Sequence, residues 1–94
     1  MFWVYIVQNN LDSEIYIGRT SNITQRISDH NNGGKKFTTR KNGEWKLIYA
    51  ELYRTEKDAN EREAKLKQHG GSKRQLFKRI RNSLFEPKNG AGRS

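Results

Sequence analysis

Strand-like runs of apolar side chains at the amino terminus predict a β-hairpin. Residues 2–8 are rich in aromatic and β-branched side chains, and residues 14–19 resume the same character. The five residues between them, NNLDS at 9–13, are typical of a turn. Tyr5 and Tyr16 therefore fall on two neighbouring strands.

A helical spacing follows the hairpin. Ile23 and Ile27 are four residues apart and predict an inward face, with Thr20 or Ser21 as the N-cap. The NNGG run at residues 31–34 ends this helix. The hairpin is thus expected to lead directly into a short helix.

Residues 45–53 predict a third strand, because apolar side chains recur there with the period of a pleated chain. Strict alternation places Trp45, Leu47, Tyr49 and Glu51 on one face and Lys46, Ile48, Ala50 and Leu52 on the other. Apolar residues on both faces favour a central position for this strand in the sheet.

Two further helices complete the predicted order. Thr55 with Asp58 resembles a capping box and opens a helix to about residue 68, and Ser72 with Gln75 caps another to about residue 83. The last helix carries an apolar stripe of Leu76, Phe77, Ile80 and Leu84. Residues 86–94 are expected to be a disordered tail, which leaves one domain over residues 1–85. The order β-β-α-β-α-α predicts a small α/β fold, with a three-stranded, largely antiparallel sheet flanked by helices.

Composition narrows the class of protein. Only 32% of the 94 residues are hydrophobic, so the core must be small. The chain has no cysteine, which excludes a disulfide framework and a thiolate zinc site. No apolar stretch approaches the roughly 20 residues that a membrane span needs. The amino terminus has the character of a strand rather than of a signal peptide, so we expect a cytoplasmic protein with no membrane partner.

The charge is concentrated in the last third of the chain. Residues 1–64 hold ten Lys/Arg and nine Asp/Glu, whereas residues 65–94 hold nine Lys/Arg and one glutamate, within a net charge of +9. Such an asymmetry favours a polyanionic partner, above all nucleic acid, over a merely soluble basic protein.

Glu63 falls between apolar positions of the inward stripe predicted for the second helix. A desolvated carboxylate needs a nearby cation such as Arg62 or Arg26, or a bound metal ion. The alternative is that Glu63 lies at the edge of the stripe and pairs with Lys67, four residues on.

Arg26 and His30 are also four residues apart and share one face of the first predicted helix. Taken singly, Arg26 is a surface cation and His30 is a residue that the helix dipole favours at a carboxyl end. With Tyr5, Tyr16 and Glu63, the set suits phosphodiester hydrolysis, because it supplies a metal ligand, a cation for the phosphate and a proton relay.

These residues also carry a family resemblance. Residues 16–18 read Tyr-Ile-Gly, and residues 3–5 (WVY) keep the tyrosine of a first triplet. The matching runs are TSNITQRISDHNNG at 20–33, FTTRKNGEWKLIYAE at 37–51 and ANEREAKLK at 59–67. The chain resembles the GIY-YIG nuclease superfamily, especially its small bacterial single-domain members. It is more distantly similar to the nuclease domain of the bacterial excision-repair incision subunit.

The resemblance implies a metal-dependent endonuclease that hydrolyses DNA, in repair or recombination. It implies Tyr5 as general base relayed by His30, Tyr16 orienting the phosphate or the water, Arg26 stabilising charge, and Glu63 holding one Mg²⁺ or Mn²⁺ ion. The alternative is a non-catalytic DNA- or RNA-binding module that retains the fold. That alternative gains from the small size of the chain, whereas the complete set of five residues favours catalysis.

We expect the five site residues to line one shallow concave surface, flanked by two basic segments that grip DNA phosphates. These segments contribute Lys73, Arg74, Lys78, Arg79 and Arg81 from the third helix, and Lys35, Lys36, Arg40 and Lys41 from the loop before the third strand. Phosphate contacts carry little base information, so binding is expected to depend weakly on sequence. The expected substrate is DNA, branched or damaged forms included, and not a small molecule.

Overall fold

The computed structural model describes residues 1–32, 43–68 and 70–84. Its elements are β1 (Phe2–Asn9), β2 (Ile15–Thr20), α1 (Ile23–Asn31), β3 (Trp45–Tyr53), α2 (Glu56–Lys67), α3 (Gly71–Arg79) and a 3₁₀ turn (Arg81–Ser83). The strands form one antiparallel sheet in the order β2-β1-β3. The order β-β-α-β-α-α and the fold class are thereby confirmed, while the predicted tail at 86–94 lies outside the described residues.

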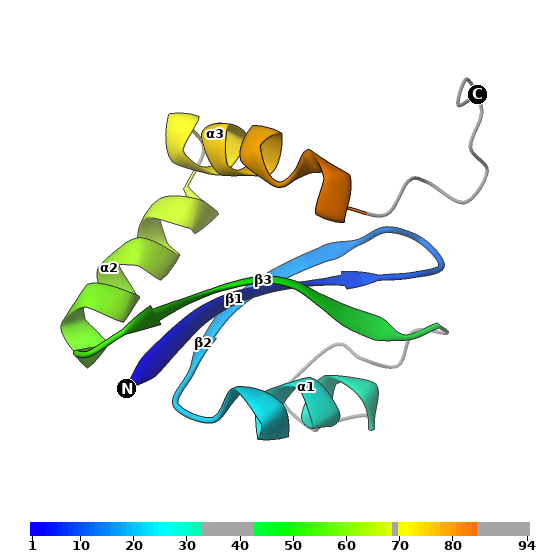
Figure 1. Ribbon diagram of the computed structural model, residues 1–94, viewed down its shortest axis with the longest axis horizontal. Coiled ribbons are helices and arrows are strands. Elements are labelled where there is room, and N and C mark those ends of the chain that lie inside the picture. Colours follow the sequence, from blue (N-terminus) through cyan, green and yellow to red (C-terminus); the bar gives the residue numbers. More distant parts are fainter. Residues whose placement is uncertain (33–42, 69, 85–94) are drawn as a thin grey trace.

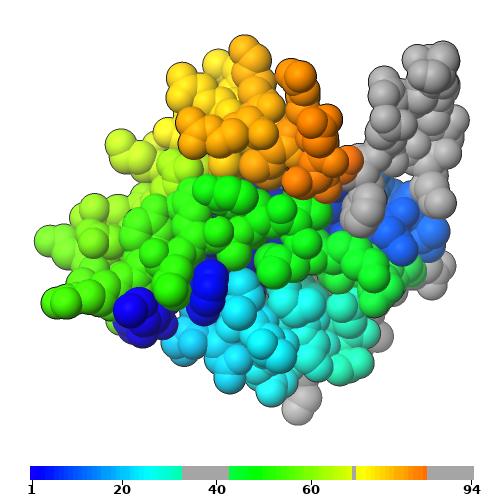
Figure 2. Space-filling view, in the orientation of Figure 1, coloured from blue at the N-terminus to red at the C-terminus, as the bar shows by residue number. Residues whose placement is uncertain are grey.

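Helices cover both faces of the sheet: α1 packs against one face, and α2 and α3 lie on the other (Figure 1). Because successive side chains of a strand point to opposite faces, β1 supplies both cores. Val4 and Ile6 pack with the buried side chains of α2 and α3. Tyr5 and Val7 pack on the α1 side. In the space-filling view, β3 is seen with α3 and α1 on its two sides (Figure 2).

The prediction that β3 is the central strand is wrong, because β1 pairs with both of the others. A register shift at Ile6/Val7 in the β1–β3 ladder also breaks the predicted alternation along β3. Ile48 and Tyr49 are neighbours in sequence, yet both pack against the cluster under α2 and α3. Apolar residues on both faces of β3 therefore reflect this irregularity and the two helical layers, not a central position.

Helix caps agree with the sequence at α2 only. Thr55 accepts a hydrogen bond from the backbone N–H of Asp58 at 3.2 Å, as predicted. Helix α1 is capped by Asn22 instead of Thr20 or Ser21, and the Thr20 hydroxyl accepts from the Asn22 N–H at 3.0 Å.

The predicted cap at Ser72 is wrong, because α3 begins at Gly71 and Ser72 lies inside the helix. Its N-cap position is Gly70, which provides no side-chain cap. None of the helices among the described residues has the length and apolar character needed to span a bilayer.

A polar cluster ties α2 to β3. Arg62 donates from Nε to Glu51 Oε1 at 2.9 Å and from Nη2 to Oε2 at 3.0 Å, and the hydroxyls of Tyr49 and Tyr53 donate to the same carboxylate. Burial raises the pKa of Glu51, but these hydrogen bonds outweigh it and hold the pKa below its ordinary value. The carboxylate in turn adds to burial in raising the pKa of Tyr53 to about 12.

The Glu51 cluster predicts an acid sensitivity. A carboxyl whose pKa is lowered by folding contributes stability above its ordinary value of 4.5, and loses it as the pH falls through the folded pKa. Urea unfolding of Glu51→Gln is therefore expected to show a smaller loss of unfolding free energy below pH 4.5 than the wild type. The exposed Glu61→Gln is the control and should keep the wild-type pH dependence. Equal slopes for Glu51→Gln and wild type would contradict this role.

Candidate active site

The centre of the candidate site is a buried hydrogen bond between β1 and α1. Tyr5 and His30 are 0% and 1% exposed, and the Tyr5 hydroxyl lies 3.0 Å from His30 Nε2. The Trp45 ring also lies beside the imidazole, with centroids 5.8 Å apart. Asn31 holds the end of α1 to β3, because its side chain accepts from the Trp45 N–H at 2.7 Å and donates to the Trp45 carbonyl at 3.0 Å.

Tyr16 brings a second phenol to the same place. Its ring centroid lies 4.8 Å from that of His30 and 6.3 Å from that of Tyr5, and its side chain is half-buried. Gly18 lies opposite Tyr5 in the β1–β2 ladder. A Cβ on Gly18 would lie 2.6 Å from Tyr5 Oη and 2.8 Å from Tyr16 Cε1. The glycine is therefore needed for the two rings to meet.

The surroundings keep this pair in its neutral forms. Burial raises the pKa of Tyr5, and the nearby phenol of Tyr16 adds to the rise, against the charge and hydrogen bonding of Arg26. Glu63 lies near enough to raise the Tyr5 pKa slightly further. Burial, followed by the Arg26 charge, lowers the pKa of His30 below 6.5. At neutral pH Tyr5 therefore keeps its proton and His30 is uncharged.

The five predicted residues do not all line an open surface. Tyr16 and Arg26 are half-buried, as a surface site requires, but Tyr5 and His30 lie beneath the surface. The expectation of a shallow surface lined by all five is wrong for this pair. The physical reason is that Tyr5 belongs to the central strand, whose side chains are covered by α1 on this face.

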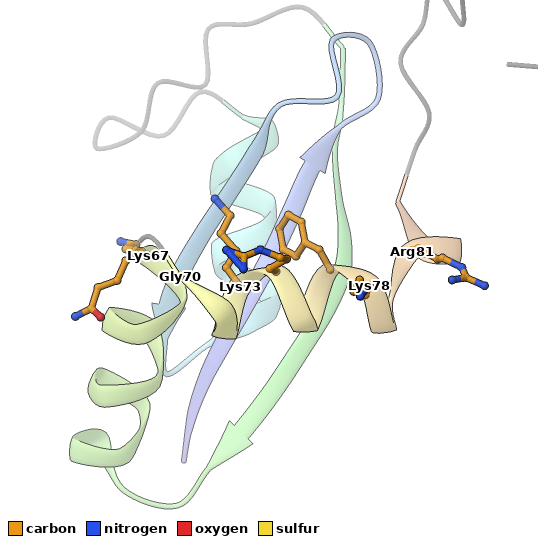
Figure 3. A pocket seen from close by; sticks show the side chains of 8 residues that line it. Lys67, Gly70, Lys73, Lys78 and Arg81 are labelled. Carbon is orange, nitrogen blue, oxygen red and sulfur yellow. The ribbon is translucent and has the colours of Figure 1, made fainter. Parts of the chain in front are cut away.

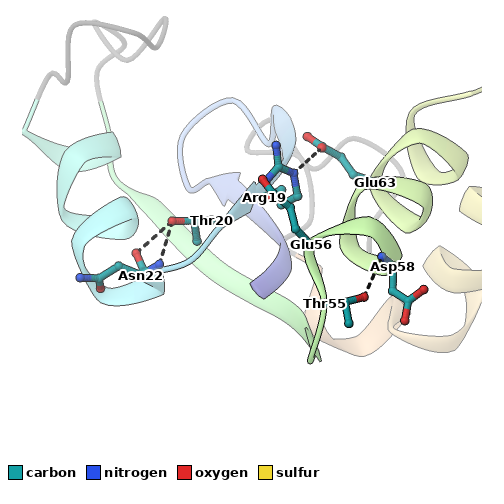
Figure 4. Close-up of polar contacts among 7 residues, drawn as sticks. All are labelled: Arg19, Thr20, Asn22, Thr55, Glu56, Asp58 and Glu63. Carbon is teal, nitrogen blue, oxygen red and sulfur yellow. Dashed lines mark hydrogen bonds and ion pairs between the residues drawn. The ribbon is translucent and has the colours of Figure 1, made fainter. Parts of the chain in front are cut away.

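Glu63 is held by two cations. The Glu63 side chain is 19% exposed, and Lys67 Nζ lies 2.9 Å from its Oε2. Arg19 Nε lies 3.5 Å from its Oε1 (Figure 4). The pairing with Lys67 is the one expected for a residue at the edge of the stripe. Arg62 takes no part, since it binds Glu51.

Arg19 is the residue that the sequence reasoning missed. It follows Gly18 directly, and alternation turns its side chain toward α2 while Tyr16 and Gly18 face α1. There it contacts Glu56 at 3.1 Å as well as Glu63 (Figure 4). The sequence did contain a signal for Arg19, because it is the one cation in β2 and alternation puts it on the face opposite Tyr16. Through it, β2 positions the carboxylate of α2.

A metal ion would have one carboxylate to bind at this site. Within residues 1–32, 43–68 and 70–84, no three acidic or histidine side chains gather as a metal cluster. Glu63 alone lies near Tyr5, and its side chain is partly open to solvent. A single carboxylate fits an ion such as Mg²⁺, which keeps most of its waters.

The basic residues of α3 and of the 3₁₀ turn that follows it are exposed, but they do not all line the same hollow. Lys73, Arg74, Lys78 and Arg81 line a hollow between α2 and α3 (Figure 3). Arg79 borders a separate hollow with Arg62. The predicted DNA contacts at Lys35, Lys36, Arg40 and Lys41 lie outside the described residues.

The geometry agrees with a known family. Residues 1–82 match the model of the GIY-YIG catalytic domain. The chain belongs to the GIY-YIG family. A UPF0213 protein of Clostridium perfringens is 41% identical over 68 residues, which cover 71% of each chain. A UPF0213 protein of Staphylococcus epidermidis is 38% identical over 66 residues, covering 69% of this chain and 78% of that one.

A solved structure of a family relative supports the same fold. The solution NMR structure of a UPF0213 protein from Bacillus halodurans aligns with a TM-score of 0.52 and 25% identity, over 85% of each chain. The resemblance read from the tyrosine triplets is thus confirmed, together with a nuclease-type domain.

The contact of Gly18 with the two tyrosines predicts a steric cost for Gly18→Ala. The Tyr5 ring is fully buried, so the added methyl group should force a shift in packing and destabilise the fold by about 1–3 kcal/mol. Urea denaturation measures this cost. The control is Gly71→Ala, because a Cβ at that position meets no atom within 4 Å. A Gly18→Ala protein as stable as wild type would contradict the close packing.

Proposed function

We propose that this protein is a metal-dependent endonuclease that hydrolyses DNA phosphodiester bonds. The observation that carries the proposal is the buried Tyr5–His30 hydrogen bond, with Tyr16 and Arg26 beside it. This set can remove a proton from water and stabilise negative charge at one place, as phosphodiester hydrolysis requires. Membership of the GIY-YIG family supports the same reaction class. A role in DNA repair or recombination, in the cytoplasm, belongs to the proposal.

Proton transfer is assigned to the buried pair. A water beside the half-buried Tyr16 attacks phosphorus and forms the new P–O bond, while its proton passes to the Tyr5 hydroxyl and Tyr5 gives its own proton to His30 Nε2. The bond from phosphorus to the leaving oxygen breaks, and that oxygen takes up a proton from solvent. His30 then returns its proton through Tyr5. The raised pKa of Tyr5 favours this relay over a permanently ionised tyrosine. The lowered pKa of His30 keeps the acceptor neutral at neutral pH.

Charge stabilisation is assigned to Arg26 and Glu63. The charge and hydrogen bonding of Arg26 act on Tyr5, which supports assigning its guanidinium to bind the phosphate as the P–O bond breaks. Glu63 would hold one divalent ion, which supplies charge neutralisation at the phosphate. Arg19 Nε of β2 lies 3.5 Å from the Glu63 carboxylate, and we assign it the role of positioning that group.

Removal of either charged group should abolish most of the activity. Arg26→Ala and Glu63→Ala are expected to slow cleavage by about 100- to 1000-fold, the typical effect of losing one preorganised charge stabiliser. The measurement is single-turnover cleavage of labelled duplex, nicked and branched DNA with Mg²⁺ or Mn²⁺. Glu61→Ala and Arg54→Ala are matched controls, because both side chains are exposed. Cutting at the wild-type rate by either test variant would contradict the assigned roles.

The proton relay predicts a pH dependence and a sensitive hydroxyl. Cleavage should rise with pH through the pKa of His30, which lies below 6.5, because only neutral His30 accepts the proton. Tyr5→Phe keeps the packed ring and should lower the rate by about 100- to 10,000-fold. Unchanged cleavage by Tyr5→Phe would make the hydroxyl structural. A wild-type protein that binds DNA but cuts none of the substrates would leave the binding module as its function.

A further inference from the structure

A hollow of about 550 Å³ lies along α3 at the end of α2, and neither Tyr5 nor Tyr16 lines it. Five cations border it, Lys67 from α2 and Lys73, Arg74, Lys78 and Arg81 from the following segment (Figure 3). Among the residues that the structure describes, one aromatic ring, Phe77, completes the wall, and no acidic side chain contributes to the lining. A ligand of this hollow must therefore be anionic and must offer a flat apolar group.

Phe77 is placed as a platform rather than as a core residue. The sequence assigned it to the apolar stripe of α3, whose members Leu76 and Ile80 are indeed buried. Phe77 packs against that core yet stays half-exposed and borders the hollow. The Lys73 ammonium lies 5.7 Å from its ring centroid. The Phe77 ring thus packs against the core, and the Lys73 ammonium lies over the ring.

The cations around the ring have charge to offer. Lys67 is paired with Glu63, but no carboxylate of the described residues forms an ion pair with Lys73, Arg74, Lys78 or Arg81. Between Lys73 and Arg81 this segment extends about 12 Å at the rise of a helix. Several successive phosphates of one strand could therefore be bound along it.

We propose that this hollow binds unpaired nucleotides of a DNA strand, with a base stacked on Phe77 and the phosphates held by the surrounding cations. Aromatic platforms combined with basic grooves are the usual means of binding single strands. A paired base has its faces covered in the duplex, so Phe77 selects an unpaired segment. A membrane surface fits poorly, because the apolar residues Leu76 and Ile80 are buried and unavailable to a bilayer.

The position of Lys67 gives the hollow a role in cleavage. Lys67 lines the hollow and bonds Glu63 at 2.9 Å, so a strand bound there lies beside the carboxylate assigned to the metal. Resting on the proposed function, this makes the substrate a DNA with a single-stranded branch, flap or gap next to the cut. The hollow would hold an unpaired strand of the same DNA that the site near Tyr16 cuts.

Binding measured without divalent metal tests the hollow apart from cleavage. The probes are a fluorescent oligothymidine, an abasic strand with the same number of phosphates and a blunt duplex, followed by fluorescence anisotropy. Wild type should bind the oligothymidine at least about fivefold more tightly than the abasic strand, from stacking of one base. Phe77→Leu should lose this preference while keeping its affinity for the abasic strand, and Phe77→Trp should retain it. Circular dichroism checks that each variant is folded.

Charge removal gives a second readout. Lys73→Gln with Arg74→Gln should reduce the slope of log affinity against log salt by about 1.4, since each single-strand phosphate contact contributes about 0.7. The control is Lys57→Gln with Lys65→Gln, two exposed cations that do not border the hollow.

The outcomes separate this inference from the proposed function. It is overturned if Phe77→Leu keeps the preference for bases, if the control pair lowers the slope equally, or if a polyglutamate peptide of equal charge binds as tightly. If the wild type cuts none of the DNA substrates but still prefers the oligothymidine to the abasic strand, the nuclease proposal fails and the inference about the hollow stands. If the wild type cuts duplex DNA, Phe77→Leu does not change the rate, and neither protein prefers bases, the nuclease proposal stands and the inference about the hollow fails.

Discussion

The Tyr5 phenol crosses the backbone of β2 at the one position that has no side chain. An added Cβ at Gly18 would lie within 2.8 Å of both tyrosine rings, so the two strands can be paired and the two rings adjacent only with glycine there. The Tyr5 hydroxyl reaches His30 from this position, and Trp45 and Asn31 hold α1 against the sheet around it. The contacts that pack α1 against the sheet at this end of the fold are therefore also the contacts that form the candidate site.

The elements were largely predictable because their signals are local. Residues 45–53 carry strand residues throughout, and Thr55 with Asp58 caps α2 as its sequence indicates. The place of β3 in the sheet was not predictable, because strand order depends on contacts between distant segments. The cap at Asn22 was missed because Thr20, Ser21 and Asn22 are all good caps, and only the path of the chain leaving β2 selects among them.

The candidate site was predictable as a set of residues but not as a shape. Spacing placed Arg26 and His30 on one helical face, and the resemblance singled out Glu63. Neither revealed that His30 would be buried against Tyr5. Neither revealed that Arg19, on the face of β2 opposite Tyr16, would form an ion pair with Glu63. The residues come from both layers around the sheet, with Tyr16, Arg26 and His30 on the α1 side and Glu63 on α2. Such an arrangement depends on strand order and helix placement, which no local pattern contains.

The register shift at Ile6/Val7 divides β3 into two parts with different partners. Trp45 packs beside Tyr5 on the α1 side, whereas Tyr49, Glu51 and Tyr53 form the anchor for α2. Because the register shift between them breaks the alternation of side chains, the direction in which one part points does not fix the direction of the other. Over evolutionary time, a length change at the start of β3 could therefore be accommodated there without turning the Glu51 anchor to the wrong face. The end of β3 that packs beside Tyr5 and the end that anchors α2 are therefore free to diverge separately.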